Sequence, residues 1–206
     1  MIRKLRPFHA GEESHQRRRR EVIGLIGTHH GVGVTYTGLM LAFYMAEERG
    51  KRTAYLECNK HQDMVLIRST YDWSSEEENA FSFHRVTCFP EVKGDQIATV
   101  LNDDYECFIL DFGTDYIHNR DELLRCDMKI VIGGKSAWEV LKLINFVNET
   151  ELISGSDSWL YFIPQASDRV MRIIKKEVDR EVIAVPFIEE PVLPSKIINH
   201  FFDRIL

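Results

Sequence analysis

No apolar run in this 206-residue chain approaches the length of about 20 residues that a membrane-spanning helix needs. The start of the chain is too basic and too polar for a secretory signal peptide. No two of the four cysteines form a Cys-x-x-Cys pair. These absences predict a cytoplasmic protein with reduced, mostly buried thiols, which are Cys58, Cys88, Cys107 and Cys126.

The chain also lacks the excess of positive charge that general nucleic-acid binders carry. Its net charge is −6, and residues 1–20 hold seven Arg and Lys against two Glu, so residues 21–206 carry −11. We therefore expect no general nucleic-acid binding. Residues 1–20 are predicted to form a basic, flexible leader rather than an arm for anionic lipid or nucleic acid, and residues 21–206 to form one domain.

What the chain does contain is a glycine-rich loop between a strand-like and a helix-like segment. Residues 27–36 read Gly-Thr-His-His-Gly-Val-Gly-Val-Thr-Tyr. A β-branched apolar run over residues 22–26 precedes the loop, and residues 35–49 follow with apolar side chains at helical density until Gly50. This context is typical of a phosphate-binding loop, in which backbone N–H groups and the helix N-terminus surround an anion.

The loop keeps the glycine framework of such a site but has no lysine. Against the pattern Gly-x4-Gly-Lys-Ser/Thr, Gly33 and Thr35 match, whereas Thr28 replaces the first glycine and Val34 replaces the lysine. A charge-assisted hydrogen bond contributes about 1.5–3 kcal/mol, so this loss weakens phosphate binding by about tenfold to a hundredfold or somewhat more. The predicted nucleotide-binding residues are Thr28, His29, His30, Gly31, Val32, Gly33, Val34, Thr35 and Tyr36.

With these residues the chain resembles the MinD/ParA family of P-loop ATPases, whose loop reads Lys-Gly-Gly-x-Gly-Lys-Thr. On that motif His29 takes the position of the signature lysine, Val34 that of the P-loop lysine and Thr35 that of the magnesium ligand. Residues 105–113 resemble the Walker B strand, with Asp111 as its carboxylate. Residues 182–187 resemble the late strand before the base-contacting loop.

The family's Asp-x-Asp at the end of the second strand reads Glu57-Cys58-Asn59 in this chain. The resemblance implies magnesium ligands at Thr35, Asp111 and Glu57, but Asn59 carries no charge and cannot act as a base. ATP or ADP with Mg²⁺ is therefore expected to bind weakly or not at all. The family's other implications are a homodimer or a protein partner, and a role in positioning or assembling a cellular machine.

Hydrophobic periodicity predicts an α/β fold with one doubly wound, mostly parallel sheet flanked by helices. The predicted strands are residues 22–26, 53–58, 83–88, 108–111, 128–132, 159–163 and 182–185. The predicted helices are residues 35–49, 95–102, 118–125, 136–149, 167–176 and 194–205. Residues 61–80 are the least regular part and are interpreted as a surface excursion.

Three functional interpretations remain open. The leading one is a pseudo-ATPase that acts through protein contacts, and the second is a slow ATPase whose missing lysine comes from another subunit. The third is a metal site. Its candidate ligands have the right side-chain types, but no two of them stand at a standard metal-ligand spacing; they are His29, His30, Glu57, Cys58, His61 and Asp111. A dinucleotide site fails because Tyr36 stands where Gly-x-Gly-x-x-Gly needs its last glycine.

Four further expectations concern single residues and the last helix. Protonated His29 would supply partial positive charge beside a phosphate, and His30 stands at a position expected to need a positive φ. The last predicted helix has an apolar face, which we expect to pack on the sheet rather than to anchor in a membrane. The tryptophans are expected to pack in the core or at caps: Trp73, Trp138 and Trp159.

Overall fold

The computed structural model describes residues 20–71, 75–76 and 79–206, so residues 1–19 of the predicted leader and Trp73 lie outside the described residues. Its strands are β1 (Glu21–Gly27), β2 (Thr53–Glu57), β3 (Ser75–Glu76), β4 (Phe81–Phe83), β5 (Val86–Phe89), β6 (Cys107–Asp111), β7 (Met128–Ile132), β8 (Leu160–Pro164) and β9 (Val182–Val185). They form one sheet in the order β3-β4-β5-β2-β6-β1-β7-β8-β9. In this order, each strand from β5 through β2, β6, β1, β7 and β8 to β9 is parallel to its neighbour. The pairs β3–β4 and β4–β5 are antiparallel. The predicted mostly parallel sheet is therefore confirmed.

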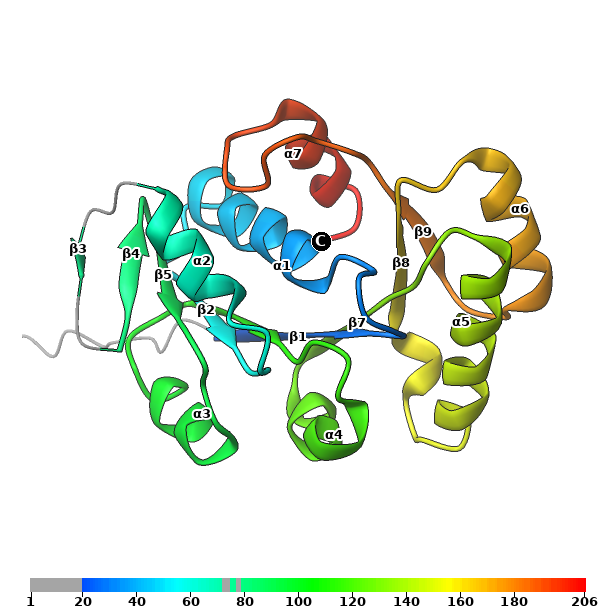
Figure 1. Ribbon diagram of the computed structural model, residues 1–206, viewed down its shortest axis with the longest axis horizontal. Helices are drawn as coiled ribbons and strands as arrows, with labels where there is room; N and C mark the ends of the chain where they lie inside the picture. The colour runs from blue at the N-terminus through cyan, green and yellow to red at the C-terminus, as the bar shows by residue number, and fades with distance from the viewer. Residues whose placement is uncertain (1–19, 72–74, 77–78) are drawn as a thin grey trace, which may run out of the picture.

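Helices cover both faces of this sheet (Figure 1). The helices are α1 (Val34–Phe43), its π-helical continuation η1 (Tyr44–Glu48), α2 (Asp63–Thr70), α3 (Gly94–Val100), α4 (Tyr116–Arg125), α5 (Ala137–Thr150), the 3₁₀ turn η2 (Ser156–Ser158), α6 (Asp168–Glu177) and α7 (Lys196–Asp203). Buried residues of α1, η1, α2 and α7 belong to one apolar cluster, and those of α3 to α6 belong to another.

The strands are buried on both faces because their apolar residues alternate between these two clusters. In β6, Ile109 packs with α1 and α7, while Phe108 and Leu110 pack toward α3 and α4. Parallel strands covered on both faces read as nearly continuous apolar runs, which is why β1, β2 and β6 were predictable. Their carboxyl ends meet at one edge, where Leu25 and Glu57 both pair in register with Asp111.

Three predictions about secondary structure are wrong or incomplete. Residues 83–88 are not one strand, because the chain reverses after Phe83 through His84, whose φ is +54°, and forms the β4–β5 hairpin. The excursion over residues 61–80 contains the helix α2. The helix predicted over residues 35–49 begins at Val34 and becomes a π-helix after Phe43. It ends as predicted at Gly50, which adopts a φ of +65°.

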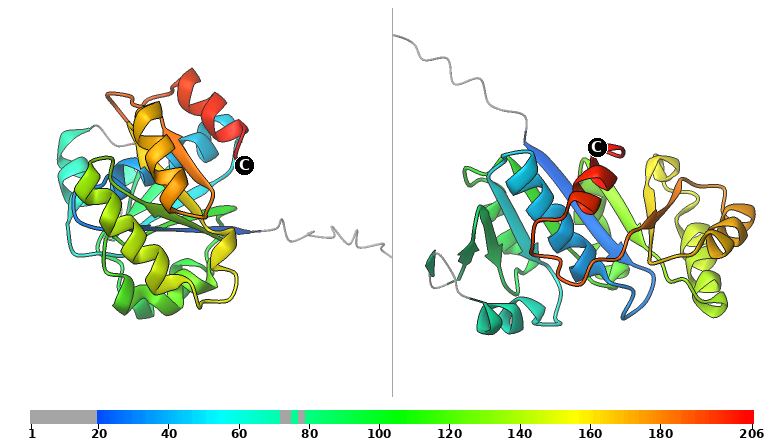
Figure 2. Two further views of the ribbon diagram at one scale, coloured as in Figure 1. Left: turned by 90° about the vertical axis from the view of Figure 1, so that its right-hand side faces the viewer. Right: turned by 90° about the horizontal axis from the view of Figure 1, so that it is seen from above.

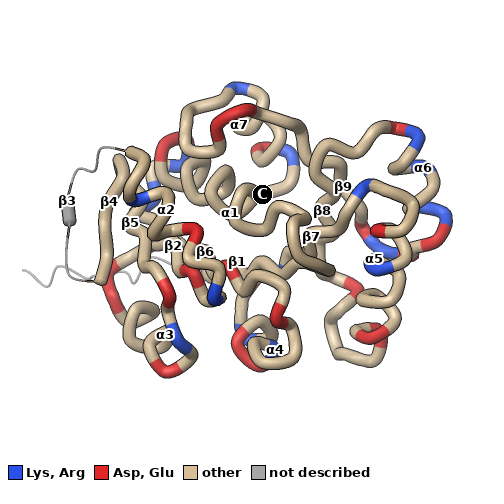
Figure 3. The backbone as a smooth tube through the Cα atoms, viewed as in Figure 1, with Lys and Arg blue, Asp and Glu red and all other residues tan. Residues whose placement is uncertain are grey.

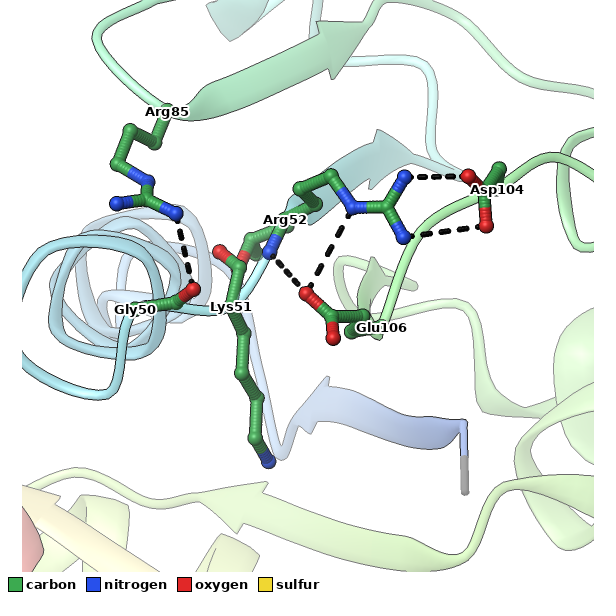
Figure 4. Close-up of polar contacts among 7 residues, drawn as sticks. Gly50, Lys51, Arg52, Arg85, Asp104 and Glu106 are labelled. Atoms are coloured by element: carbon green, nitrogen blue, oxygen red, sulfur yellow. Dashed lines mark hydrogen bonds and ion pairs between the residues drawn. The ribbon is translucent and has the colours of Figure 1, made fainter. Parts of the chain in front are cut away.

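Polar contacts tie the amino ends of three strands at the edge opposite the glycine loop, and Figure 4 shows those made by Arg52. Arg52 binds both carboxylate oxygens of Asp104, and its backbone N–H donates to Glu106 at 3.1 Å. Lys51 pairs with Glu21 at 2.6 Å. These contacts connect the residues that open β1, β2 and β6 and so hold the three strands in register.

The C-terminal helix α7 packs over α1 and η1 (Figure 2). Ile198 and Phe202 are 3% and 1% exposed, and the Phe202 ring lies 5.1 Å from that of Tyr44. The Tyr44 hydroxyl donates to Asp203 at 2.7 Å. This packing agrees with the expected core role of the helix. Within the described residues, no helix has the length and apolar character that crossing a membrane requires.

All four cysteines are free and buried, as expected. Of the described tryptophans, Trp159 is 2% exposed and lies in the core, whereas Trp138 is 59% exposed. Of the two expected locations, core or cap, Trp138 therefore does not take the core. It lies in the first turn of α5, where its ring contacts His29 and Lys142 on the surface.

Candidate functional site

The glycine loop joins the end of β1 to the start of α1 and surrounds a cavity of about 330 Å³. Gly31 and Gly33 have φ values of +84° and +93°, which only glycine adopts readily, so both are needed for the turn. Eight of the nine predicted loop residues line the cavity, from His29 to Tyr36. Thr28 does not, because its hydroxyl bonds the His29 ring at 3.0 Å and its N–H donates to Ile132.

The side chain at the lysine position points into the protein. Val34 is 7% exposed, and a Cβ atom placed on Gly27 would lie 2.6 Å from a Val34 methyl and 2.9 Å from a Val32 methyl. Both valines therefore pack on the end of β1, and Gly27 gives them the space. None of the residues that line the cavity is Lys or Arg, and the loop itself contains no Lys, Arg, Asp or Glu (Figure 3).

Thr35, the predicted magnesium ligand, is held by two carboxylates of its own chain. Its hydroxyl lies 2.8 Å from an Asp111 oxygen and 3.1 Å from an Asp63 oxygen. Asp111 accepts two further bonds, from the Tyr55 hydroxyl at 2.7 Å and from the Gly113 N–H at 2.8 Å. Thr35 and Asp111 thus lie together, as predicted, but the protein itself satisfies the carboxylate.

Burial is the main influence on Asp111, which has no exposed surface. Burial raises its pKa, and the bonds from Tyr55, Gly113 and Thr35 act in the opposite direction because they favour the charged form. Burial and the neighbouring Asp111 raise the pKa of Tyr55 well above its usual value. The phenol therefore stays protonated and acts as the donor.

Glu57 lies beside Asp111 but uses its oxygens on the backbone. It accepts from the N–H of Met64 at 3.2 Å and of Glu91 at 3.3 Å. Burial raises its pKa, and these two bonds oppose that rise. Glu57 therefore secures the start of α2 and the loop before α3. Asn59, two residues later, also bonds the backbone: its side-chain amide donates to the Asp111 carbonyl at 3.2 Å.

His29 is turned toward α5 and away from solvent. Its Nε2–H donates to Glu139 at 3.2 Å, and its side chain is 10% exposed. Burial alone would raise the pKa of Glu139, but bonds from the Ser136 hydroxyl and N–H, together with His29, lower it to about 2. Gly134 makes room for this arrangement, since a Cβ there would lie 2.5 Å from that of Glu139.

His30 does not have the positive φ expected at its position, since the left-handed residues of the loop are Gly31 and Gly33. Its ring packs edge-on against His61, with centroids 5.0 Å apart. Among the described residues, no three His, Cys, Asp or Glu side chains gather in a way that could hold a metal ion. The metal-site interpretation therefore finds no support in this part of the chain.

Sequence reasoning missed Asp63 and Tyr55, although both contact the predicted pair. Asp63 opens α2, and an acidic residue before the apolar Met64 and Ile67 is a helix-start signal that could have been recognised. No local pattern marks Tyr55, which reaches Asp111 from the middle of a buried strand. Gly38 leaves space for its ring, since a Cβ there would lie 3.0 Å from it.

Tyr36 connects the loop's helix to the segment after β9. Its hydroxyl donates to the carbonyl of Ile188 and accepts from the Ile188 N–H at 3.2 Å. The late strand predicted by resemblance therefore leads into a segment that contacts Tyr36, one of the residues that line the cavity.

The nine-strand order and the loop at the end of β1 can be compared with known structures. A plasmid partition protein from Borrelia burgdorferi B31 bound to AMPPNP superposes with a TM-score of 0.63 at 13% identity, over 91% of this chain and 100% of that one. The chain has the ParA/MinD fold. A ParA family ATPase from Chlorobium tepidum gives 0.62 at 13% identity, over 84% of this chain and 86% of that one. The MinD cell division protein of Aquifex aeolicus gives 0.60 at 15% identity, over 87% of this chain and 86% of that one. No family model and no curated protein sequence matches the chain.

Proposed function

We propose that this chain is a pseudo-ATPase of the ParA/MinD fold, which binds nucleotide weakly or not at all and acts through protein contacts in positioning or assembling a cellular machine. The observation that carries the proposal is the cavity behind the glycine loop. No Lys or Arg lines it, and Val34 at the lysine position packs on Gly27.

Electrostatics supports weak binding and little hydrolysis. Phosphoryl transfer depends almost entirely on positioning and on stabilising charge on the phosphate oxygens. Here the charged or imidazole side chains at the cavity are three histidines and Asp63, and His29 already pairs with Glu139. A polyphosphate would meet a carboxylate and no permanent cation.

Exposed apolar side chains near the carboxyl edge of the sheet support a role in protein contacts. Leu66 on α2, Ile117 in the first turn of α4 and Trp138 in the first turn of α5 are 64%, 84% and 59% exposed. Exposed apolar surface around a site is typical of protein interfaces. We propose self-association at this edge, with or without a second protein.

One observation favours the alternative of a slow ATPase. Thr35 and Asp111 lie together at 2.8 Å, so a second subunit would need to supply only the missing cations. This alternative requires Asp111 for turnover, whereas the pseudo-ATPase requires neither turnover nor nucleotide.

Calorimetric titration with ATP and Mg²⁺, followed by a phosphate-release assay, tests the proposal. We expect no saturable binding with a Kd below about 1 mM, which corresponds to about −4 kcal/mol, and no phosphate release. Binding in the micromolar range with turnover that is lost in Asp111→Ala would overturn the proposal and establish the slow ATPase. Sedimentation velocity of the full chain and of Trp138→Ala reports on self-association.

A further inference from the structure

A second cavity, of about 470 Å³, opens beside the one behind the glycine loop. It lies at the carboxyl ends of β2 and β6, between the starts of α3 and α4, and it shares His61 and Thr114 with its neighbour. Ligands of open α/β sheets bind at this edge, and the volume is within the range of small-molecule sites. The position and size both suit a small ligand.

Both apolar and cationic groups line this second cavity. Cys58 and Val92 are 6% and 9% exposed and form apolar lining. The thiol is neutral, since burial raises the pKa of Cys58 well above its usual value. Lys60 and Lys93 are exposed and also line the cavity, so a ligand there meets hydrocarbon and positive charge together.

The acidic side chains of the cavity accept hydrogen bonds, whereas its lysines form no close ion pair among the described residues. Glu91 accepts from Gln62 at 2.7 Å, and Asp115 accepts from the His118 N–H at 3.3 Å and ring at 2.7 Å. The His118 bond is the main reason that the pKa of Asp115 is lowered, and Lys60 adds to it through space. Within the described part of the chain, neither lysine forms an ion pair.

We propose that this second cavity binds a small organic anion, a carboxylate or a phosphate ester. Lys60 and Lys93 pair with its charged group, and its carbon skeleton lies against Cys58 and Val92. The two lysines supply the positive charge that such an anion needs at this cavity. The site uses neither Thr35 nor Asp111, so it does not depend on the proposed function or on whether ATP binds.

Titration of the full chain with three phenyl compounds tests the proposal. Phenyl phosphate and phenylacetate carry the two anionic groups, and benzyl alcohol is their neutral counterpart. We expect at least one anion to bind saturably with a Kd at or below about 1 mM while the alcohol does not. Amide shifts in ¹⁵N-labelled protein should centre on Asn59, Lys93 and Gly94 rather than on Gly31 and Gly33.

The double variant Lys60→Gln/Lys93→Gln should weaken binding at least tenfold. Lys176→Gln/Lys196→Gln removes the same charge from exposed positions on α6 and α7 and should leave binding unchanged. Binding of phenyl phosphate alone assigns the site to phosphate esters, and binding of phenylacetate alone assigns it to carboxylates. Equal binding of all three compounds, no binding of any, shifts centred on the glycine loop, or equal behaviour of the two variants would overturn the proposal.

Discussion

The Tyr55 hydroxyl donates a 2.7 Å hydrogen bond to the Oδ2 atom of Asp111, and neither residue has exposed surface. The bond joins the middle of β2 to the end of β6 and favours the charged form of the Asp111 carboxylate, against the effect of burial. Hydrogen bonds to charged groups are worth more than neutral ones, so this contact should contribute measurably to stability.

Tyr55→Phe should therefore lower the free energy of unfolding by about 1.5–3 kcal/mol, measured by urea denaturation at pH 7. Tyr161→Phe is the matched control, because Tyr161 is also fully buried in a strand but its hydroxyl makes no hydrogen bond of normal geometry within the described residues. Equal losses in the two variants would mean that the contact with Asp111 has no special energetic role.

Gly134→Ala should destabilise the protein by about 1–3 kcal/mol, because the new methyl overlaps the Glu139 side chain in a crowded position. The control is Gly94→Ala at the start of α3, where a Cβ meets nothing within 4 Å. That change should be neutral or stabilise by up to about 1 kcal/mol through the unfolded state. Urea midpoints of the two variants give the comparison, and a neutral Gly134→Ala would show that Glu139 can move without cost.

Lowering the pH should remove the contribution of Glu139 to the free energy of unfolding. Its pKa is lowered from 4.5 to about 2, so its stabilising effect is complete above pH 4.5 and is lost as the pH falls toward 2. Glu139→Gln should therefore lower stability at pH 7 and show a smaller further loss between pH 4.5 and pH 2 than the wild type. Glu149→Gln, at an exposed glutamate of the same helix, should keep the wild-type pH profile. Parallel profiles for all three proteins would contradict the assignment.

The glycine loop, the strand that ends at Asp111 and the parallel sheet were predictable because each is encoded locally. Gly31 and Gly33 are needed for left-handed turns, and Asp111 ends an apolar strand covered on both faces. The reversal at His84 was not predictable, since residues 83–88 hold strand-forming side chains and neither Gly nor Pro. His84 takes its positive φ in the short turn that lets Phe83 pair with Val86, and histidine is not a residue that marks such a turn.

The contacts of the candidate site were less predictable than its residues. Thr35 and Asp111 were expected to meet, because the carboxyl ends of parallel strands share an edge. Two further residues contact this pair: Asp63 of α2 bonds Thr35, and Tyr55 of β2 bonds Asp111. These contacts depend on how α2 and β2 pack, and the hydrophobic periodicity of the sequence does not predict them. Glu57 remains a predicted magnesium ligand, and no sequence pattern indicates that its oxygens also accept from the backbone N–H groups of Met64 and Glu91.

Phe202→Ala on α7 should lower the free energy of unfolding by about 3–5 kcal/mol, because it removes a buried ring that contacts Tyr44. Ile197→Ala on the same helix should change it by less than about 0.5 kcal/mol, since Ile197 is 60% exposed. Urea denaturation measures both. If α7 were instead a membrane anchor, wild type would sediment with anionic liposomes and Ile197→Ala would not.

Val34→Lys should restore the missing cation of the glycine loop. A charge-assisted hydrogen bond to a phosphate contributes about 1.5–3 kcal/mol, so affinity for ATP with Mg²⁺ should rise by about tenfold to a hundredfold in calorimetry. Thermal melting should show that the variant still folds, since the lysine stem can cover part of the surface that the valine methyls now cover on Gly27.

Val32→Lys is the control for Val34→Lys, because Val32 packs on the same glycine and is equally buried but stands at the variable position of the motif. It adds the same charge to the same loop and should give a much smaller gain in affinity. A gain in Val34→Lys alone would show that the loop backbone is intact and that the lost lysine limits binding. If Val34→Lys folds but its affinity for ATP does not rise, then Asp63 and the hydrogen bonds among Thr35, Asp63 and Asp111 are what limits ATP binding.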